Sequence, residues 1–189
     1  MQFGISILSV IPIRESPSDK SEMTTQLIFG EHYKILEQRK KWSRIKIAHD
    51  KYTGWISNNQ VHIIYQEEYD KLDKEIVTLT TDILDIIEGE SNQPIVIGSV
   101  LPTYKSDHAL IKNKMYKFLG KKTQGFSEKK HLVNNALIFL NTPYLWGGRT
   151  PFGIDCSGFT QIVYRLQGIN IPRDAYQQAE VGNTLSFIE

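Results

Sequence analysis

The stretch that decides the fold lies in the C-terminal third of the chain. It reads Pro143-Tyr144-Leu145-Trp146-Gly147-Gly148-Arg149-Thr150-Pro151-Phe152-Gly153-Ile154-Asp155-Cys156-Ser157-Gly158-Phe159. This stretch contains the only cysteine among the 189 residues of the chain. The glycines and prolines before the cysteine predict a loop, and the residues after it predict a helix.

The helix is predicted by apolar residues that recur along one face. Their spacing of i, i+3, i+4 and i+7 is shown by Phe159, Ile162, Val163 and Leu166. This is the pattern of a helix that buries one side. Asp155 stands where an N-cap residue is expected, and Gly168 stands where the helix should end. Cys156 therefore falls in the first turn.

The position of Cys156 favours a reactive thiol. Unpaired backbone N–H groups and the positive end of the helix dipole stabilise a thiolate relative to the thiol, and this is how a cysteine nucleophile is usually prepared. The alternative is that a lone free cysteine is a buried, inert small hydrophobe. The loop, the cap and the amphipathic helix together favour the nucleophile.

Three short segments carry a resemblance to a known family. They are Tyr144-Leu145-Trp146-Gly147-Gly148, Gly153-Ile154-Asp155-Cys156-Ser157-Gly158-Phe159 and Ile171-Pro172-Arg173-Asp174-Ala175-Tyr176-Gln177-Gln178. These segments resemble the nucleophile half of the NlpC-type cell-wall cysteine peptidases, which are papain-like. The first part of the chain resembles the bacterial SH3-like modules that precede this domain in γ-D-glutamyl-L-diamino-acid endopeptidases.

The resemblance implies a role for several residues. Cys156 is the expected nucleophile, and its own backbone N–H, helped by Tyr144, is the expected oxyanion donor. Gly147 and Gly148 are expected to let the backbone pass close to the substrate. Five residues are expected to bind substrate, namely Asp155, Ser157, Glu22, Tyr52 and Arg173.

Two of these residues come from the SH3-like module. In the related endopeptidases this module lies over the cleft, where an acid and a tyrosine hold the free amine of the first L-alanine. Glu22 and Tyr52 are the best matches, with Asp155 pairing with the same amine, and such charge-assisted hydrogen bonds weaken when the amine is acylated. The alternative for Glu22 is an ordinary solvated carboxylate. Where relatives often carry a serine this chain has Ala175, which removes one expected hydrogen bond to substrate.

The general base is the largest departure from the family pattern. A cysteine peptidase of this type needs a histidine to accept the thiol proton, and the family places it after the cysteine. All five histidines of this chain precede Cys156, namely His32, His49, His62, His108 and His131. We therefore expect a truncated peptidase domain that is inactive as given. A downstream strand bearing histidine would favour the enzyme, and a natural stop codon would favour a binding module.

Composition sets few further limits. The hydrophobic content is 40%, the charged content is 23% and the net charge is +1, which is ordinary for a globular protein. This charge gives no electrostatic reason to expect nucleic acid or an anionic membrane as partner. A single cysteine excludes an internal disulfide framework. The N-terminus lacks a basic segment followed by a small-residue cleavage site, so we expect a cytoplasmic protein.

The first part of the chain predicts a small β-barrel over residues 1–65. Its expected strands cover Ile5 to Ile13, Thr24 to Phe29, Tyr33 to Leu36, Trp42 to Ile47 and Tyr52 to Ile56. Turn-forming residues separate them. Five short strands with such turns are typical of a barrel.

The middle of the chain predicts a linker and a second barrel. Residues 66–75 are mostly charged and predict a short linker, at most two helical turns. Residues 76–122 predict another SH3-like barrel, with strands at Ile76 to Ile87, Pro94 to Leu101 and Tyr116 to Leu119. Residues 123–189 then form the partial peptidase domain, which opens on a helix capped by Ser127. The expected fold class is α+β, with two small β-barrels before the helical, nucleophile-bearing part of a papain-like domain.

The resemblance implies one function above the others. This is hydrolysis of the D-γ-glutamyl–L-diamino acid bond of peptidoglycan stem peptides that carry a free N-terminal L-Ala, in cell-wall recycling. The alternative is a non-catalytic module that binds cell-wall peptides. We expect the peptide L-Ala-γ-D-Glu-L-diamino acid as partner, and we expect no cofactor, metal, nucleic acid or membrane.

Overall fold

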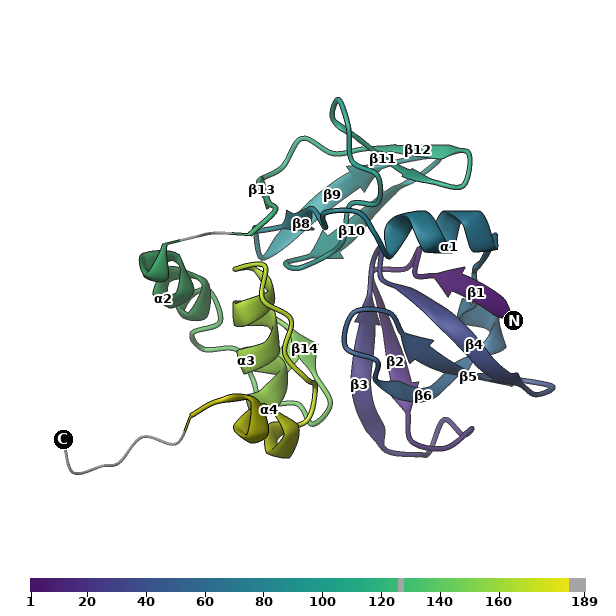
Figure 1. The fold of residues 1–189 in the computed structure, drawn as a ribbon, viewed down its shortest axis with the longest axis horizontal. Coiled ribbons are helices and arrows are strands. Elements are labelled where there is room, and N and C mark those ends of the chain that lie inside the picture. The colour runs from purple at the N-terminus through teal and green to yellow at the C-terminus, as the bar shows by residue number, and fades with distance from the viewer. Residues whose placement is uncertain (126–127, 184–189) are drawn as a thin grey trace.

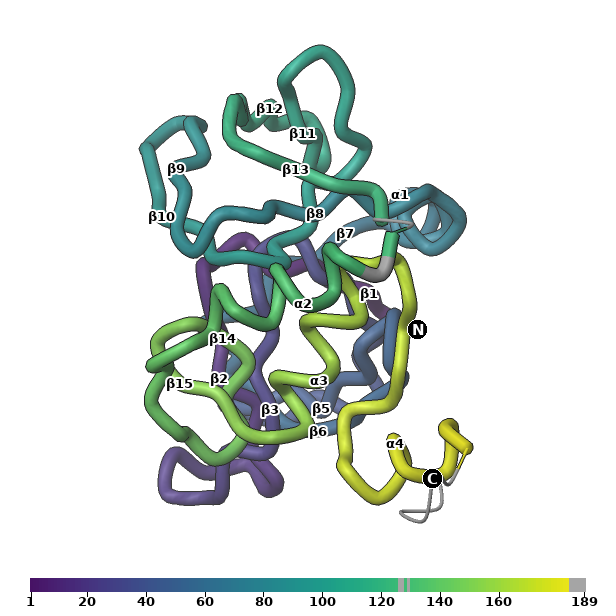
Figure 2. Tube along the Cα trace, turned by 90° about the vertical axis from the view of Figure 1, so that its left-hand side faces the viewer, coloured from purple at the N-terminus to yellow at the C-terminus, as the bar shows by residue number. Residues whose placement is uncertain are grey.

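The computed structural model describes residues 1–125 and 128–183, which form three adjoining regions. Strands β1 to β7 make one sheet, strands β8 to β13 make a second region beside it, and helices α2 to α4 carry the predicted nucleophile (Figure 1). Turning the molecule by 90° shows α3 in front of the strands of the first sheet (Figure 2). The predicted α+β class is confirmed.

The first sheet is antiparallel and has the order β3-β2-β6-β5-β4-β1-β7. Its strands are β1 (Gln2–Ile5), β2 (Val10–Arg14), β3 (Met23–Ile28), β4 (His32–Gln38), β5 (Trp42–Ile47), β6 (Thr53–Ser57) and β7 (Ile63–Ile64), with a 3₁₀ turn at Asn58–Gln60. Alternate residues point inward, so β2 buries Ile11 and Ile13 while β5 buries Ile45 and Ile47. This period of two is what the sequence predicted.

The expected strand from Ile5 to Ile13 is wrong, because the chain turns between β1 and β2. The hydroxyl of Ser6 donates to the carbonyl of Leu8, and the Ser6 carbonyl accepts from Gly30 N–H. These bonds hold a bend against the turn after β3, so the run divides into two strands that pair with different neighbours.

The second region contains short strands, and two expected strands are wrong in extent. A four-stranded sheet has the order β10-β9-β12-β11, and β8 pairs with β13. The strands are β8 (Leu79–Thr80), β9 (Leu84–Glu88), β10 (Asn92–Val96), β11 (His108–Ile111), β12 (Lys114–Lys117) and β13 (Lys122–Thr123). The run from Ile76 breaks into β8 and β9. The run from Pro94 ends at Val96 because Gly98 adopts a φ of 79°.

The two sheet regions share one core through helix α1 (Gln66–Leu72). Tyr69 and Leu72 of this helix are buried against Phe3 of the first sheet and Ile87 of the second. The segment predicted as a charged linker is therefore a packed helix. Tyr69 and Leu72 are three positions apart and lie on one face of the helix. The many charged residues around them concealed this pattern in the sequence.

The third region is built on two antiparallel hairpin strands and three helices. They are α2 (Lys129–Leu137), β14 (Arg149–Thr150), β15 (Gly153–Ile154), α3 (Cys156–Arg165) and α4 (Ala175–Val181). Ser127, the expected cap of α2, lies outside the described residues. Leu137 and Leu140 are exposed, and Phe139 between them is buried. No helix among the described residues has the length and apolarity needed to cross a bilayer.

Candidate active site

Cys156 is the first residue of α3 and is exposed. Asp155 caps the helix, because its Oδ1 accepts a hydrogen bond of 2.7 Å from Gly158 N–H. The helix ends before Gly168, whose φ of 80° belongs to the left-handed region. The predicted helix, cap and stop are confirmed. The alternative of a buried, inert cysteine does not apply to this arrangement.

The two glycines before the helix serve packing of the loop. Gly147 has a φ of 76°, and a Cβ added there would lie 2.3 Å from the carbonyl oxygen of Met23 in β3. A Cβ on Gly148 would lie 2.3 Å from the carbonyl oxygen of Gly153. Close packing against protein backbone therefore requires glycine at both positions, and the expected approach of this backbone to substrate stays a prediction.

Asp155 is engaged by protein donors on both oxygens. Oδ1 accepts from Gly158 N–H, from the Ser157 hydroxyl at 3.2 Å and from Arg173 Nη1 at 3.0 Å. Oδ2 accepts from Gly147 N–H at 2.9 Å and from Arg173 Nη2 at 2.6 Å. Burial alone would raise the pKa of Asp155, but the hydrogen bonds and charge of Arg173 outweigh burial and lower it. A substrate amine would have to displace one of these donors.

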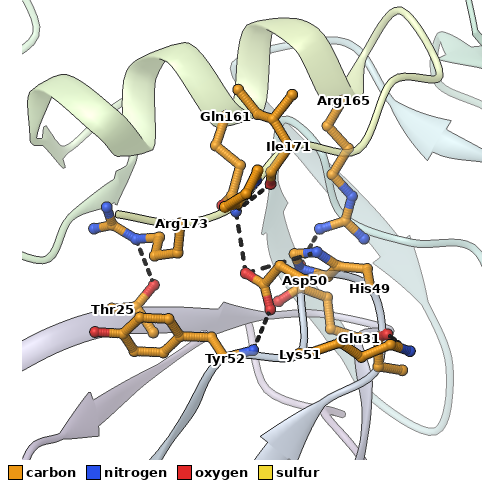
Figure 3. Close-up of polar contacts among 12 residues, drawn as sticks. Thr25, Glu31, His49, Asp50, Lys51, Tyr52, Gln161, Arg165, Ile171 and Arg173 are labelled. Atoms are coloured by element: carbon orange, nitrogen blue, oxygen red, sulfur yellow. Dashed lines mark hydrogen bonds and ion pairs between the residues drawn. The ribbon is translucent and has the colours of Figure 1, made fainter. Parts of the chain in front are cut away.

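Arg173 is 2% exposed, so its guanidinium does not reach solvent where a substrate could meet it. Its Nε donates to the Thr25 hydroxyl of β3 at 2.8 Å, and its Nη1 donates to the Ser157 hydroxyl at 2.7 Å. The side chains of Arg173 and Ser157 are both engaged by protein groups, and their expected contact with substrate stays a prediction. The bond of Arg173 to Thr25 ties the start of α3 to the first sheet (Figure 3).

The remaining predicted site residues are more accessible. Glu22 is exposed, and its Oε1 accepts a hydrogen bond from the indole N–H of Trp146, which is 61% exposed. Tyr144 is exposed in the same loop and forms a bridge with Ile154, just before Cys156. The structure thus brings a carboxylate of the first sheet to the loop that leads into the nucleophile.

Tyr52 is half-buried beside Arg173 on the sheet face that meets α3 (Figure 3). Burial raises the pKa of Tyr52, and the nearby carboxylate of Asp174 adds to this effect. No described contact joins Tyr52 to Glu22. The paired amine site that was expected from these two residues is therefore not assembled by direct contact between them.

A buried ionic cluster joins the first sheet to the third region, and the sequence analysis missed it. Glu31, in the turn after β3, is fully buried. Its carboxylate receives Arg149 Nη1 and Nη2, each at 3.1 Å, together with Arg165 Nη1 and His49 Nε2. Burial would raise the pKa of Glu31, but the charges of Arg149, Arg165 and His49 outweigh it and hold that pKa well below its usual value.

The same cluster continues to the middle of α3 (Figure 3). Gln161 Nε2 donates to Asp50 Oδ2 at 3.1 Å, and Asp50 Oδ2 lies 3.7 Å from Nδ1 of His49. Burial and the charge of Arg165 lower the pKa of His49, and the carboxylates of Asp50 and Glu31 oppose this shift only in part. Arg149 lies inside the stretch quoted at the outset. The charged Arg149, which follows Gly148 and begins the buried strand β14, is a sequence signal that could have pointed to this cluster.

His49 lies at the wrong end of α3 to act as base for Cys156. It contacts the Glu31 carboxylate that binds Arg165, the last residue of α3. Cys156 is the first residue of this ten-residue helix, and the two ends are about 14 Å apart along the axis. Among residues 1–125 and 128–183, no cluster of three His, Cys, Asp or Glu side chains could hold a metal ion.

Acid is expected to destabilise the fold through His32. Burial lowers the pKa of His32 from 6.5 to about 4, and the charge of Asp73 only partly opposes this. Between these values the unfolded chain binds a proton that the folded chain does not, so stability falls as pH drops from 6.5 towards 4. The loss expected from His32 is roughly 3 kcal/mol at pH 4. Urea unfolding at several pH values measures it. If the free energy of unfolding falls equally steeply with pH in the wild type and in His32→Gln, the role given to His32 is contradicted.

Comparisons with known proteins match both ends of this arrangement. The family model described as "Bacterial dipeptidyl-peptidase Sh3 domain" matches residues 13–61, and the NlpC/P60 family model matches residues 141–188. The first match spans most of the first sheet, and the second includes the loop and α3. These matches confirm the resemblance that the sequence motifs indicated. The SH3 likeness of residues 76–122 stays a prediction.

Similar whole proteins point the same way. The chain is 27% identical over 190 residues to a gamma-D-glutamyl-L-lysine dipeptidyl-peptidase of Bacillus cereus, covering 87% of this chain and 56% of that protein. A Bacillus subtilis protein of the same name is 26% identical, covering 84% and 58%. The chain thus spans a little over half the length of these relatives. The crystal structure of an NlpC/P60 family protein from Bacillus cereus shares the fold, with a TM-score of 0.85, 21% identity and coverage of 98% of this chain and 79% of that one.

Proposed function

We propose that this chain, which joins a bacterial SH3 domain to an NlpC/P60 segment, is the nucleophile-bearing part of a cysteine peptidase. Its substrate would be a peptidoglycan stem peptide with a free N-terminal L-Ala, cut between D-γ-glutamate and the L-diamino acid. The observation that carries the proposal is Cys156, exposed at the first position of a capped helix within the NlpC/P60 match. A cytoplasmic role in cell-wall recycling is part of the proposal.

Cys156 would act by covalent catalysis. Its thiolate attacks the carbonyl carbon of the γ-glutamyl group, and the developing oxyanion is stabilised by backbone N–H groups at the start of α3. The amine of the diamino acid leaves with a proton, and water then hydrolyses the thioester. Arg173, through its bonds to Asp155 and Ser157, would hold the helix start in place during these steps.

The proton transfers need a histidine, and the histidines of this sequence all precede Cys156. His49, the one that lies beside α3, serves the ionic cluster at the opposite end of the helix. We therefore propose that the chain as given binds the peptide and presents the thiol to it without cleaving it. Cleavage would need a histidine other than these five as base. A non-catalytic peptide-binding module is the second candidate.

Glu22 is the available carboxylate for the substrate amine, because Asp155 is saturated by protein donors. Replacing Glu22 with glutamine is expected to weaken binding of L-Ala-γ-D-Glu-L-Lys about tenfold, the effect of losing one charge-assisted hydrogen bond. Binding of the N-acetylated peptide should not change. Titration calorimetry measures both. Glu15→Gln, in the same β2–β3 hairpin, is the matched control, and an equal loss in both variants would argue against an amine site at Glu22.

Turnover by the whole gene product tests the function itself. Cleavage of L-Ala-γ-D-Glu-L-Lys to the dipeptide and lysine, followed by mass spectrometry, supports the peptidase. Binding of the peptide without cleavage by any form of the protein supports the binding module. Absence of both binding and cleavage would overturn the proposal.

A further inference from the structure

A cavity of about 320 Å³ lies away from Cys156, where the first sheet, the segment after α1 and the end of α3 meet. We call it the junction cavity. Its polar wall includes His32, His49, Asp73 and Arg165, and its apolar wall includes Leu72 and Val77. Small-molecule sites start at about this volume and combine an apolar lining with a few placed polar groups.

Arg165 supplies a cation with spare donors. Its side chain is 5% exposed, and its one hydrogen bond to a described residue runs from Nη1 to Oε1 of Glu31. A guanidinium carries five N–H donors in a fixed fork. Arg165 also lines a second cavity of about 260 Å³, which shares His49 and Val77 with the first. Arg165 thus lines both cavities with donors that Glu31 does not use, and a carboxylate is the natural partner of a guanidinium.

The cavity is also lined by carboxylates, of which Glu31 is paired with Arg149 and Arg165, Glu75 lies near Lys71, and Asp73 is the most exposed. Oδ1 of Asp73 lies 3.6 Å from Nε2 of His32, and the Asp73 side chain is 47% exposed. The pKa of His32 is lowered by burial to about 4, with Asp73 opposing and Arg165 adding to the shift. His32 is thus neutral at pH 7 and does not compensate the charge of Asp73. The charges of both Asp73 and Arg165 act on the His32 ring. Lys51 also lines the cavity, but its ammonium donates to the carbonyl of Ala48.

We propose that the junction cavity binds a zwitterionic amino acid or dipeptide. The carboxylate of the ligand pairs with Arg165, its ammonium pairs with Asp73, and its side chain packs on Leu72 and Val77. The site is separate from the nucleophile, because Arg165 and Cys156 are the two ends of α3. It also contacts all three regions of the fold, so occupancy stabilises their arrangement.

Binding of L-alanyl-L-alanine tests this site. Titration calorimetry on the whole chain should detect binding, and the N-acetylated and C-amidated dipeptides should each bind at least about tenfold more weakly, since each lacks one charge. Asp73→Asn should weaken the binding of L-alanyl-L-alanine to the same degree. It should leave the binding of the N-acetylated dipeptide unchanged. Asp70→Asn, on an exposed position of α1, makes the same change of charge outside the cavity and should have no effect.

Two further measurements distinguish binding at the junction cavity from misfolding of the variants and from binding at another site. The ring NMR signals of His32 and His49 should shift on titration of the wild type, which needs no substitution in the cavity. Glu22→Gln, which is expected to weaken peptide binding at the nucleophile, should leave the affinity for L-alanyl-L-alanine unchanged. Binding that is lost in Glu22→Gln, that ignores either charge of the dipeptide, or that leaves the His32 signals unmoved would overturn the proposal, as would no detectable binding.

Discussion

Replacing Glu31 with alanine is expected to destabilise the chain by about 3–5 kcal/mol, the cost of leaving buried charges without their partner. Glu31 is fully buried, and its carboxylate is shared by Arg149 and Arg165. Removal of the carboxylate leaves two buried guanidinium groups without the partner that they share. Such a loss is a large part of the total stability of an ordinary domain. Urea unfolding, with the midpoint and slope fitted together, measures it.

The chain offers a matched control for this prediction. Glu37 is paired with Arg39 at 2.6 Å, but both side chains are about half exposed. Glu37→Ala should cost no more than about 1 kcal/mol, because solvent screens a surface ion pair. A second variant separates charge from packing. Glu31→Leu combined with Arg149→Met and Arg165→Met removes all three charges and should recover much of the lost stability. Equal effects of Glu31→Ala and Glu37→Ala would contradict the role of the cluster.

Replacing Cys156 with alanine is expected to abolish cleavage of L-Ala-γ-D-Glu-L-Lys by the whole gene product, by at least about 10⁴-fold. The reason is that the thiolate forms the covalent bond to the scissile carbonyl, and no other group at the helix start can replace it. Because Cys156 is exposed, the same substitution should change the free energy of unfolding by less than about 0.5 kcal/mol. Peptide binding should survive.

Comparison of Cys156→Ala with the wild type thus separates chemistry from structure. Ser16→Ala, in an exposed turn of the first sheet, is the control for a harmless substitution. Cleavage that persists in Cys156→Ala would show that another group is the nucleophile. Loss of folding in Cys156→Ala would mean that the thiol has a packing role.

Local patterns in the sequence predicted the elements that bear the chemistry. The spacing of Ile162 and Val163 gave the buried face of α3, and Asp155 and Gly168 gave its ends, because caps and helical periodicity depend on neighbouring residues alone.

Contacts between distant segments could not be read in the same way. Glu31 and Arg149 are more than a hundred residues apart, and nothing local to either one shows that the other will bury it. Arg173 was assigned to substrate because it follows a recognised motif. Its actual partners, Thr25 and Asp155, come from two separate regions of the fold. Tyr69 was hidden for a similar reason, since the charges around it suggested a solvated linker, whereas residues of both sheet regions, Phe3 and Ile87 among them, bury it.

The most direct test of the central claim uses an electrophile shaped like the substrate. The chloromethyl ketone of L-Ala-γ-D-Glu alkylates a thiolate, forming a sulfur–carbon bond and releasing chloride. Intact-mass and peptide mass spectrometry of the treated chain should show one adduct, at Cys156, formed at least about tenfold faster in the folded chain than in urea. The N-acetylated reagent should lose most of this advantage. Equal rates in the folded and unfolded chain, or no adduct on Cys156, would contradict the claim that the fold presents this thiol to a peptide carbonyl.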